Sequence, residues 1–258
     1  MIPKLSKHNK TTGFTLVELA IVITIIGILI GGVLKGQQLI EQARLAGTIQ
    51  QMTGYRTATQ IFEATYEYLP GDIPDPEKRI IDCGGCVSGN GDRSITPNGF
   101  AGQDLEKDTE STQFWLHLYK ADMITGVTDA ALTTEPVGVG TTHPASKIGN
   151  GGFYVETADG GGAWYHANVW TPRGQEPTGL ILMPMTALNS EGSGMDRRKA
   201  ASVMKSSHAY QIDQKMDDGK PATGEIRGAS WSSPGGCGET DYLINEASML
   251  CTVGYIMR

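Results

Sequence analysis

Residues 14–33 form an unbroken apolar run, FTLVELAIVITIIGILIGGV, in which Glu18 is the only charged residue. As a helix rising about 1.5 Å per residue, this run spans roughly 30 Å, the thickness of the hydrocarbon core of a bilayer. Lys4, Lys7 and Lys10 precede it, and no acidic residue does. Because cytoplasmic flanks carry the excess of basic residues, we expect a cytoplasmic N-terminus and the rest of the chain across the membrane.

A secretory signal peptide and an ordinary anchor are two simpler interpretations of this segment. A signal peptide has an apolar stretch of about 7–15 residues followed by an Ala-x-Ala-like site, whereas this run is longer and continues as LKG. An ordinary anchor gains nothing from an acid inside its span, where a carboxylate costs about 2.5–3.5 kcal/mol. The position of Glu18 therefore indicates a function for its carboxylate.

The helical pattern continues beyond the apolar run. No proline occurs between residues 4 and 69, and large apolar residues recur at helical spacings. These residues are Leu45, Ile49, Met52, Tyr55, Phe62 and Tyr66. Pro70 ends the pattern, because the residue before a proline is disfavoured in helical geometry. We predict one helix over residues 14–68, whose second half packs one face against the rest of the fold.

The remainder of the chain, residues 69–258, has a different composition. It contains most of the 34 glycines and 12 prolines and all four tryptophans, so we expect a turn-rich globular head. Strand composition occurs at 152–157, 164–170, 180–185, 242–244 and 250–256, and helical patterns at 110–124 and about 197–216. The sequence therefore predicts an α+β fold in which the long N-terminal helix packs on an antiparallel β-sheet.

The residues at the start of the apolar run form a specific pattern. A short basic leader followed by Gly13-Phe14-Thr15-Leu16-Val17-Glu18 resembles the class III signal of type IV pilins and type II secretion pseudopilins. The resemblance implies cleavage between Gly13 and Phe14 by a prepilin peptidase and N-methylation of the new Phe14 amine. Segments 69–72, 114–118 and 212–221 also resemble elements of prepilin-like proteins.

The resemblance implies the lollipop shape of a pilin in three parts. These are a cytoplasmic leader peptide (1–13), a long helix (14–68) with a transmembrane first part (14–33), and an extracytoplasmic head (69–258).

The resemblance also suggests what Glu18 does. A rigid helix holds the freed Phe14 amine about one turn from the Glu18 carboxylate, so we expect neither charge to find a good partner in its own chain. Between staggered subunits of a filament the two charges can pair. Because losing one partner of a buried ion pair costs about 3–5 kcal/mol, we expect Glu18 to fix the axial register of assembly.

Four cysteines lie in the predicted head. Cys83 and Cys86 form a close Cys-x-x-Cys pair, and Cys237 and Cys251 lie far along the chain. An oxidising compartment favours disulfides, although four cysteines allow three pairings. The cysteines divide naturally into the pairs Cys83–Cys86 and Cys237–Cys251, and the second pair resembles the disulfide that often closes a C-terminal loop in pilins. A zinc site built from the four thiolates is the alternative.

Asp213, Asp217 and Asp218 place three carboxylates within six residues, just before Gly219. Oxygen ligands at this density could hold calcium, which some pseudopilins use to order a loop of the head. The simpler interpretation is a solvated helix end with Gly219 as its left-handed stop. The segment 90–92, Asn-Gly-Asp, is a second and weaker calcium-like turn, and no other cofactor is indicated.

Neither catalysis nor nucleic-acid recognition is indicated by the sequence. The five histidines are scattered, no His-Glu-x-x-His occurs, and a formal charge of −7 does not suit direct readout of nucleic acid. The resemblance implies a non-enzymatic structural subunit of a type IV pilus-like filament. It would be held in the inner membrane with a periplasmic head, and would then enter a cell-surface or periplasm-spanning filament.

The expected partners follow from this resemblance. They are prepilin peptidase, other pilin or pseudopilin subunits, the inner-membrane assembly platform and membrane lipid. Two alternatives stay open: a pseudopilin of a type II secretion system, and a membrane-anchored extracytoplasmic binding domain that does not assemble.

Overall fold

The computed structural model describes residues 15–96, 107–132, 138–159, 178–185, 204–229, 237–238, 240–245 and 251–257. The chain divides into two compact units, residues 1–43 and 44–258. The strand predicted at 164–170, the first part of the helix predicted at 197–216, and Trp164, Trp170 and Trp231 lie outside the described residues. The division of the chain at residues 13 and 68 stays a prediction.

The described part of the first unit is helical and apolar. Helix α1 runs from Leu16 to Tyr66, and its residues up to Ala43 belong to this unit. The leucine, isoleucine and valine side chains from Leu16 to Leu34 are 47–87% exposed. In the part of the chain that the structure describes, α1 alone is long and apolar enough to cross a bilayer. An apolar surface of this extent needs lipid or protein to cover it.

The second half of α1 is the central helix of the second unit. Its buried face consists of Leu45, Thr48, Met52, Tyr55, Ala58, Thr59 and Phe62. Helix α1 ends two residues earlier than predicted because Glu67 adopts left-handed geometry, with a φ of 66°. The Glu67 N–H donates to the Glu63 carbonyl at 2.8 Å, which caps the helix before Pro70 is reached.

A four-stranded antiparallel sheet packs against this part of α1. Its strands are β1 (Gly152–Asp159), β2 (Thr178–Met185), β3 (Ile226–Ala229) and β4 (Thr252–Met257), in the order β1-β2-β4-β3. Phe153 pairs with Pro184, and Ile181 with Ile256, in the two ladders that include β2. The long helix and the antiparallel sheet give the α+β, pilin-like arrangement that the sequence predicts.

The sheet departs from the predicted strands in two places. The strand predicted at 242–244 is wrong: the Leu243 N–H donates to the Cys237 carbonyl and the Ile244 N–H to the Tyr242 carbonyl, so the chain turns there. Strand β3 was not predicted, because four residues that include a glycine give too short a pattern. It forms an edge of the sheet by pairing with β4.

Four short helical segments complete the described fold: α2 (Pro76–Arg79), α3 (Glu110–Lys120), the 3₁₀ turn η1 (Asp129–Leu132) and α5 (Ser206–Met216). Helix α3 ends before the predicted residue 124 because Asp122 is left-handed. The Met123 N–H then bonds to the Leu118 carbonyl and the Asp122 N–H to the Tyr119 carbonyl, a Schellman ending. Helix α5 begins later than predicted, since Met204 instead forms a β-bridge with Cys251.

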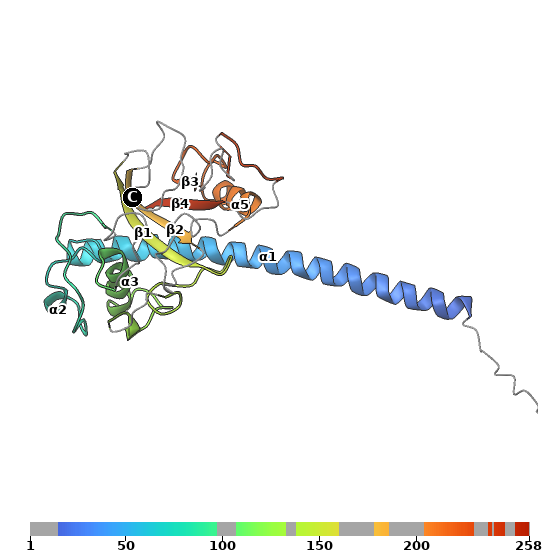
Figure 1. Cartoon of the computed structure of the whole chain (residues 1–258), viewed down its shortest axis with the longest axis horizontal. Coiled ribbons are helices and arrows are strands. Elements are labelled where there is room, and N and C mark those ends of the chain that lie inside the picture. The colour runs from blue at the N-terminus through green and yellow to red at the C-terminus, as the bar shows by residue number, and fades with distance from the viewer. Residues whose placement is uncertain are drawn as a thin grey trace, which may run out of the picture. The chain divides into compact units, whose positions relative to one another are not determined.

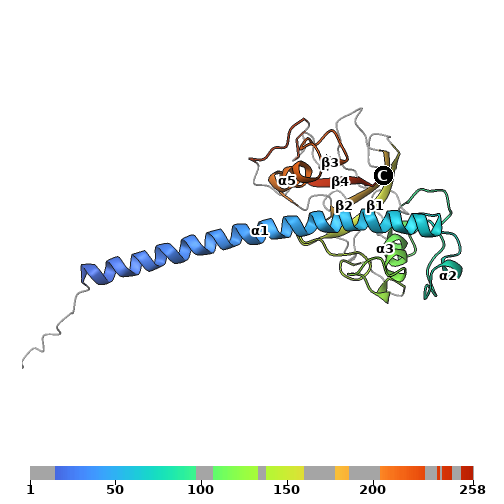
Figure 2. The same cartoon turned by 180° about the vertical axis from the view of Figure 1, so that it is seen from behind.

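The core of the second unit lies where α1, α3 and β1 meet. Figure 1 shows β3, β4 and α5 on one side of the second half of α1 and α3 on the other, and Figure 2 shows the same from behind. The Tyr55 ring contacts Trp115 of α3 and Phe153 of β1 edge to face, each with ring centroids 5.1 Å apart. One aromatic residue of α1 thus joins the helix layer to the sheet.

Candidate functional site

The N-terminus of α1 is a reciprocal cap made by Thr15 and Glu18. The Glu18 Oε2 atom accepts hydrogen bonds from the Thr15 N–H at 2.9 Å and the Thr15 hydroxyl at 2.8 Å. In return, the Glu18 N–H donates to Thr15 Oγ1 at 3.2 Å. This is the capping box that a Thr-x-x-Glu sequence forms at a helix start. Gly13 and Phe14, the predicted processing residues, lie outside the described residues.

The cap corrects one expectation about Glu18. We expected this carboxylate to have no good partner within its own chain, whereas Thr15 supplies two donors. The reason is that the first N–H groups of any helix lack intrahelical partners, and a carboxylate three residues along can turn back to one of them. Part of the cost of an acid in an apolar segment is therefore met inside a single chain.

Asp72, directly after Leu69-Pro70-Gly71, holds a loop of the second unit together. Its carboxylate accepts backbone N–H bonds from Gly91 at 2.6 Å, Asp92 at 3.2 Å and Arg93 at 2.8 Å. Burial raises the pKa of Asp72, an effect that these N–H donors oppose. Gly91 and Asp92, which belong to the segment considered as a weak calcium turn, thus direct their N–H groups to a carboxylate of their own chain. Sequence reasoning did not identify this role of Asp72.

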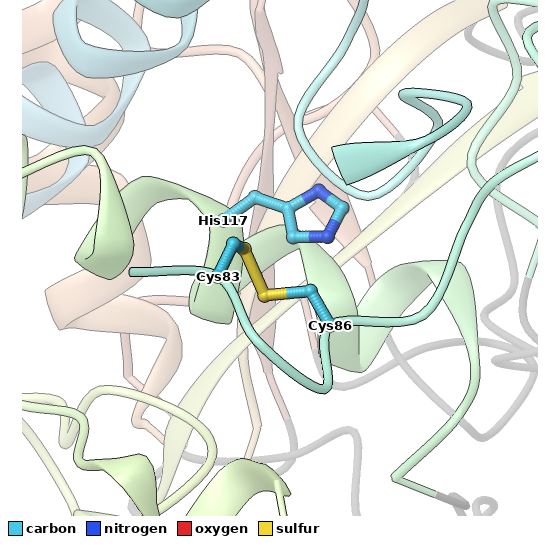
Figure 3. Close-up of side chains that lie close together, drawn as sticks. All are labelled: Cys83, Cys86 and His117. Atoms are coloured by element: carbon cyan, nitrogen blue, oxygen red, sulfur yellow. A yellow bond between two sulfur atoms is a disulfide. The ribbon is translucent and has the colours of Figure 1, made fainter. Parts of the chain in front are cut away.

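Cys83 and Cys86 are joined by a disulfide that closes a tight turn, in which the Cys86 N–H donates to the Cys83 carbonyl. Both cysteines are buried. His117 of α3 lies beside them, and one ligand atom of each of the three residues lies within 4.8 Å of the others (Figure 3). The sulfurs are bonded to one another, so in this state they offer no thiolate for zinc.

His117 is a buried neutral base. Burial lowers its pKa to about 3, against a smaller opposite effect of the Val87 backbone. Its Nδ1 atom accepts the Gly71 N–H at 2.9 Å, which places the ring proton on Nε2. The ring is also hydrogen-bonded to the Val87 backbone, which is the source of that smaller effect. The ring also stacks on Phe62 of α1, with centroids 6.5 Å apart.

The second disulfide joins Cys237 to Cys251. Cys251 directly precedes β4 and forms the bridge with Met204. The bond therefore fixes the segment after β3 to the start of β4. By the chain-entropy model, closing a loop of this size contributes about 3 kcal/mol to the free energy of unfolding.

The aspartates at the end of α5 bind protein donors. Asp213 accepts the Gly219 N–H at 2.9 Å and the Tyr242 hydroxyl at 2.8 Å, and burial raises its pKa to about 6. Asp217 accepts the N–H groups of Glu225 and Ile226. These bonds fasten the chain after α5 to the loop that leads into β3.

Asp218, the third of these aspartates, accepts the Thr223 hydroxyl and the Lys220 N–H. One carboxylate oxygen of each aspartate lies within 4.8 Å of the others, so a shared calcium ion stays a prediction. Gly219 is left-handed, but it lies three residues beyond Met216, the last residue of α5.

Comparison with known proteins bears on the N-terminal segment. Residues 8–34 match the model of the prokaryotic N-terminal methylation motif, the prepilin-type cleavage and methylation signal of type IV pilins and pseudopilins. The chain therefore has a prepilin-type signal, as its residues 13–18 suggest. No curated protein and no solved structure matches the chain.

Proposed function

We propose that this protein is a structural subunit of a type IV pilus-like filament, anchored in the inner membrane until it is assembled. The observation on which this depends is the uncovered apolar first half of α1, which begins at a prepilin-type signal and contains Glu18 as its only charge before Lys35. A helix that is apolar all round is stable only in lipid or among other apolar helices. On assembly, the helix would leave the lipid and pack among the apolar helices of other subunits.

Processing prepares the chain for this exchange. Cleavage between Gly13 and Phe14 by a prepilin peptidase would remove three lysines and create an α-amino group at the start of the apolar helix. N-methylation would leave that group cationic. The inner-membrane assembly platform would then deliver the subunit to the growing filament.

The Glu18 carboxylate gives the assembly step its selectivity. In a single chain it is partly satisfied by Thr15. Two neutral donors stabilise a carboxylate less than a cation does, because charge-assisted hydrogen bonds are roughly twice as strong. A neighbouring Phe14 amine would therefore improve the environment of Glu18 and fix one subunit in axial register with the next.

The test compares Glu18→Ala with Thr15→Ala in cells that make the full chain. We expect Glu18→Ala to be inserted and processed but absent from sheared filaments, because the partner of the amine is lost. Thr15→Ala keeps the carboxylate and should still assemble. Normal filaments from Glu18→Ala, or equal loss of filaments from both variants, would contradict the role of Glu18.

N-terminal mass analysis of the membrane-extracted protein tests the proposal as a whole. A methylated Phe14 terminus is expected, whereas a retained leader would favour a membrane-anchored binding domain that does not assemble. Two further observations distinguish a surface pilus from a type II secretion pseudopilus. Filaments sheared from the cell surface are expected for the first, and loss of protein secretion after deletion for the second.

A further inference from the structure

Three Asn-Gly pairs occur in the sequence, at 90–91, 98–99 and 150–151. Asparagine is among the thermolabile residues. In an Asn-Gly pair the backbone nitrogen of the glycine can attack the side-chain amide carbon of the asparagine, because glycine has no Cβ to hinder the approach. The pair at 98–99 lies outside the described residues. The other two pairs have the same sequence, so any difference in their reactivity comes from the structure around them.

Hydrogen bonds hold the reacting groups of Asn90 and Gly91 apart. The Gly91 N–H donates to the Asp72 carboxylate at 2.6 Å and to the Asp72 carbonyl at 3.0 Å. The Asn90 side chain binds the next residue: its Nδ2 donates to Asp92 Oδ2 at 2.9 Å, and its Oδ1 accepts the Asp92 N–H at 2.8 Å. Attack of the glycine nitrogen on the amide would require both sets of bonds to break, which costs free energy.

Asn150 and Gly151 have no such restraint. Asn150 is exposed, in the loop of a hairpin that the bridge between Ala145 and Gly152 closes. Within the part of the chain that the structure describes, neither the Asn150 side-chain amide nor the Gly151 N–H forms a hydrogen bond. The Gly151 carbonyl accepts the Ser146 N–H at 2.8 Å. The structure therefore restrains the carbonyl side of Gly151 and not the nitrogen that would react.

We propose that Asn150 is a site of spontaneous deamidation, with water as the co-reactant and a mixture of aspartate and isoaspartate as the product. The Gly151 nitrogen forms a bond to Asn150 Cγ, and the amide nitrogen leaves as ammonia with the proton of the Gly151 N–H. The product is a cyclic succinimide. Water then opens the ring: addition at the Cγ carbonyl gives aspartate, and addition at the main-chain carbonyl gives isoaspartate, in which the backbone runs through the side chain.

The loop that contains Asn150 is bound to α1, so the modification has a structural consequence. Gln51 Nε2 of α1 donates to the Ala145 carbonyl at 2.8 Å, and the Lys147 N–H donates to Gln51 Oε1 at 3.1 Å. The Lys147 side chain also passes close to Gly47 of α1. An isoaspartate would lengthen the backbone of this loop and add a carboxylate to it. Deamidation should therefore weaken the contact between α1 and the segment that leads into β1.

The experiment incubates the full chain in detergent at mildly alkaline pH, in water enriched in heavy oxygen, and follows the Asn-Gly peptides by mass spectrometry. We expect Asn150 to become labelled aspartate and isoaspartate at least about tenfold faster than Asn90, whose reaction first requires hydrogen bonds to and from charged groups to break. Asn150→Gln is the matched control and should keep its amide, because the longer side chain would have to form a larger ring.

A second measurement needs no variant and repeats the incubation in denaturant. There Asn90 and Asn150 should react at similar rates, because the hydrogen bonds that restrain Asn90 are lost. Equal rates of Asn90 and Asn150 in the folded chain would overturn the proposal. So would labelling at Asn150 no greater than in the Asn150→Gln variant, or a rate at Asn150 far lower in the folded chain than in denaturant, which would show that the fold protects Asn150 as well.

Discussion

Carboxylates that accept backbone N–H groups recur in this chain at the scale of single residues. Glu18 accepts the N–H of Thr15, Asp72 three consecutive N–H groups, and Asp213 the N–H of Gly219. Each carboxylate thereby fixes a segment that lacks regular hydrogen bonds of its own. Asp213, on α5, also accepts the Tyr242 hydroxyl and is fully buried.

Replacing Asp213 by asparagine tests the effect of that burial. Burial raises the pKa of Asp213 from 3.8 to about 6, so the folded state favours the protonated acid, and the stability this gives is lost as the pH rises from about 4 to 6. Asp213→Asn keeps the acceptor for Gly219 and never ionises. We expect the variant to gain about 1–2 kcal/mol relative to the unmodified protein between pH 4 and pH 7. Denaturant unfolding at both pH values measures this, with the exposed Asp241→Asn as control.

Among the elements of the second unit, two helices end at a residue with left-handed backbone geometry. Both α1 and α3 stop at a left-handed residue that is not glycine, Glu67 and Asp122 respectively. Residues with a side chain adopt this geometry only when the surroundings repay a cost of about 1–2 kcal/mol. In both helices, capping hydrogen bonds to carbonyls of the last turn offset part of the cost of the left-handed geometry.

Gly71, which lies close to α3, and Gly54, on an open face of α1, provide a matched test of packing in the second unit. Gly71 is left-handed with a φ of 86°, and a Cβ atom there would lie 2.2 Å from the Glu110 carbonyl oxygen of α3. Gly71→Ala should therefore destabilise the protein by at least about 2 kcal/mol. At Gly54, in the second half of α1, no atom apart from its chain neighbours and the helix backbone lies within 4 Å of the place that a Cβ would occupy, so Gly54→Ala should stabilise the protein by about 0.5–1 kcal/mol. Denaturant midpoints that move in the same direction for both variants would contradict this geometry.

At the scale of the whole molecule, buried histidines and buried aspartates oppose one another as the pH falls. Burial lowers the pKa of His117 and of His143 to about 3, so the unfolded state takes up these two protons first, from about pH 6.5 downwards. The raised pKa values of Asp213, to about 6, and of Asp72 act in the opposite direction. The two histidine shifts together outweigh the shift of Asp213 and the smaller shift of Asp72.

We therefore expect the free energy of unfolding to fall as the pH decreases from 6.5 to 4, by about 1.4 kcal/mol per pH unit for each unmatched proton. The unfolding midpoint of the full chain, measured through this range, tests the sign. Asp213→Asn should make the fall steeper, because it removes the opposing group. A midpoint that rises on acidification would show that buried carboxylates, and not the histidines, dominate.

Features that depend on local pattern can be predicted from the amino-acid sequence. The apolar run, its single acid and the absence of proline predict α1 from composition and periodicity, and residues 13–18 predict the processing signal. Strands of six or more residues, such as β1, β2 and β4, also leave a readable alternation or apolar run.

Contacts between groups that lie far apart in the chain depend on the tertiary structure. That Asp72 accepts the N–H groups of residues 91–93, and that His117 lies beside Cys83 and Cys86, depends on side chains brought together by packing across α1, α3 and their connecting loops. Strand β3 and the turn at 242–244 also depend on tertiary contacts, because β4 and Cys237 supply their hydrogen-bond partners. Local propensity contains no information about such partners, because they are set by the shape of the whole core.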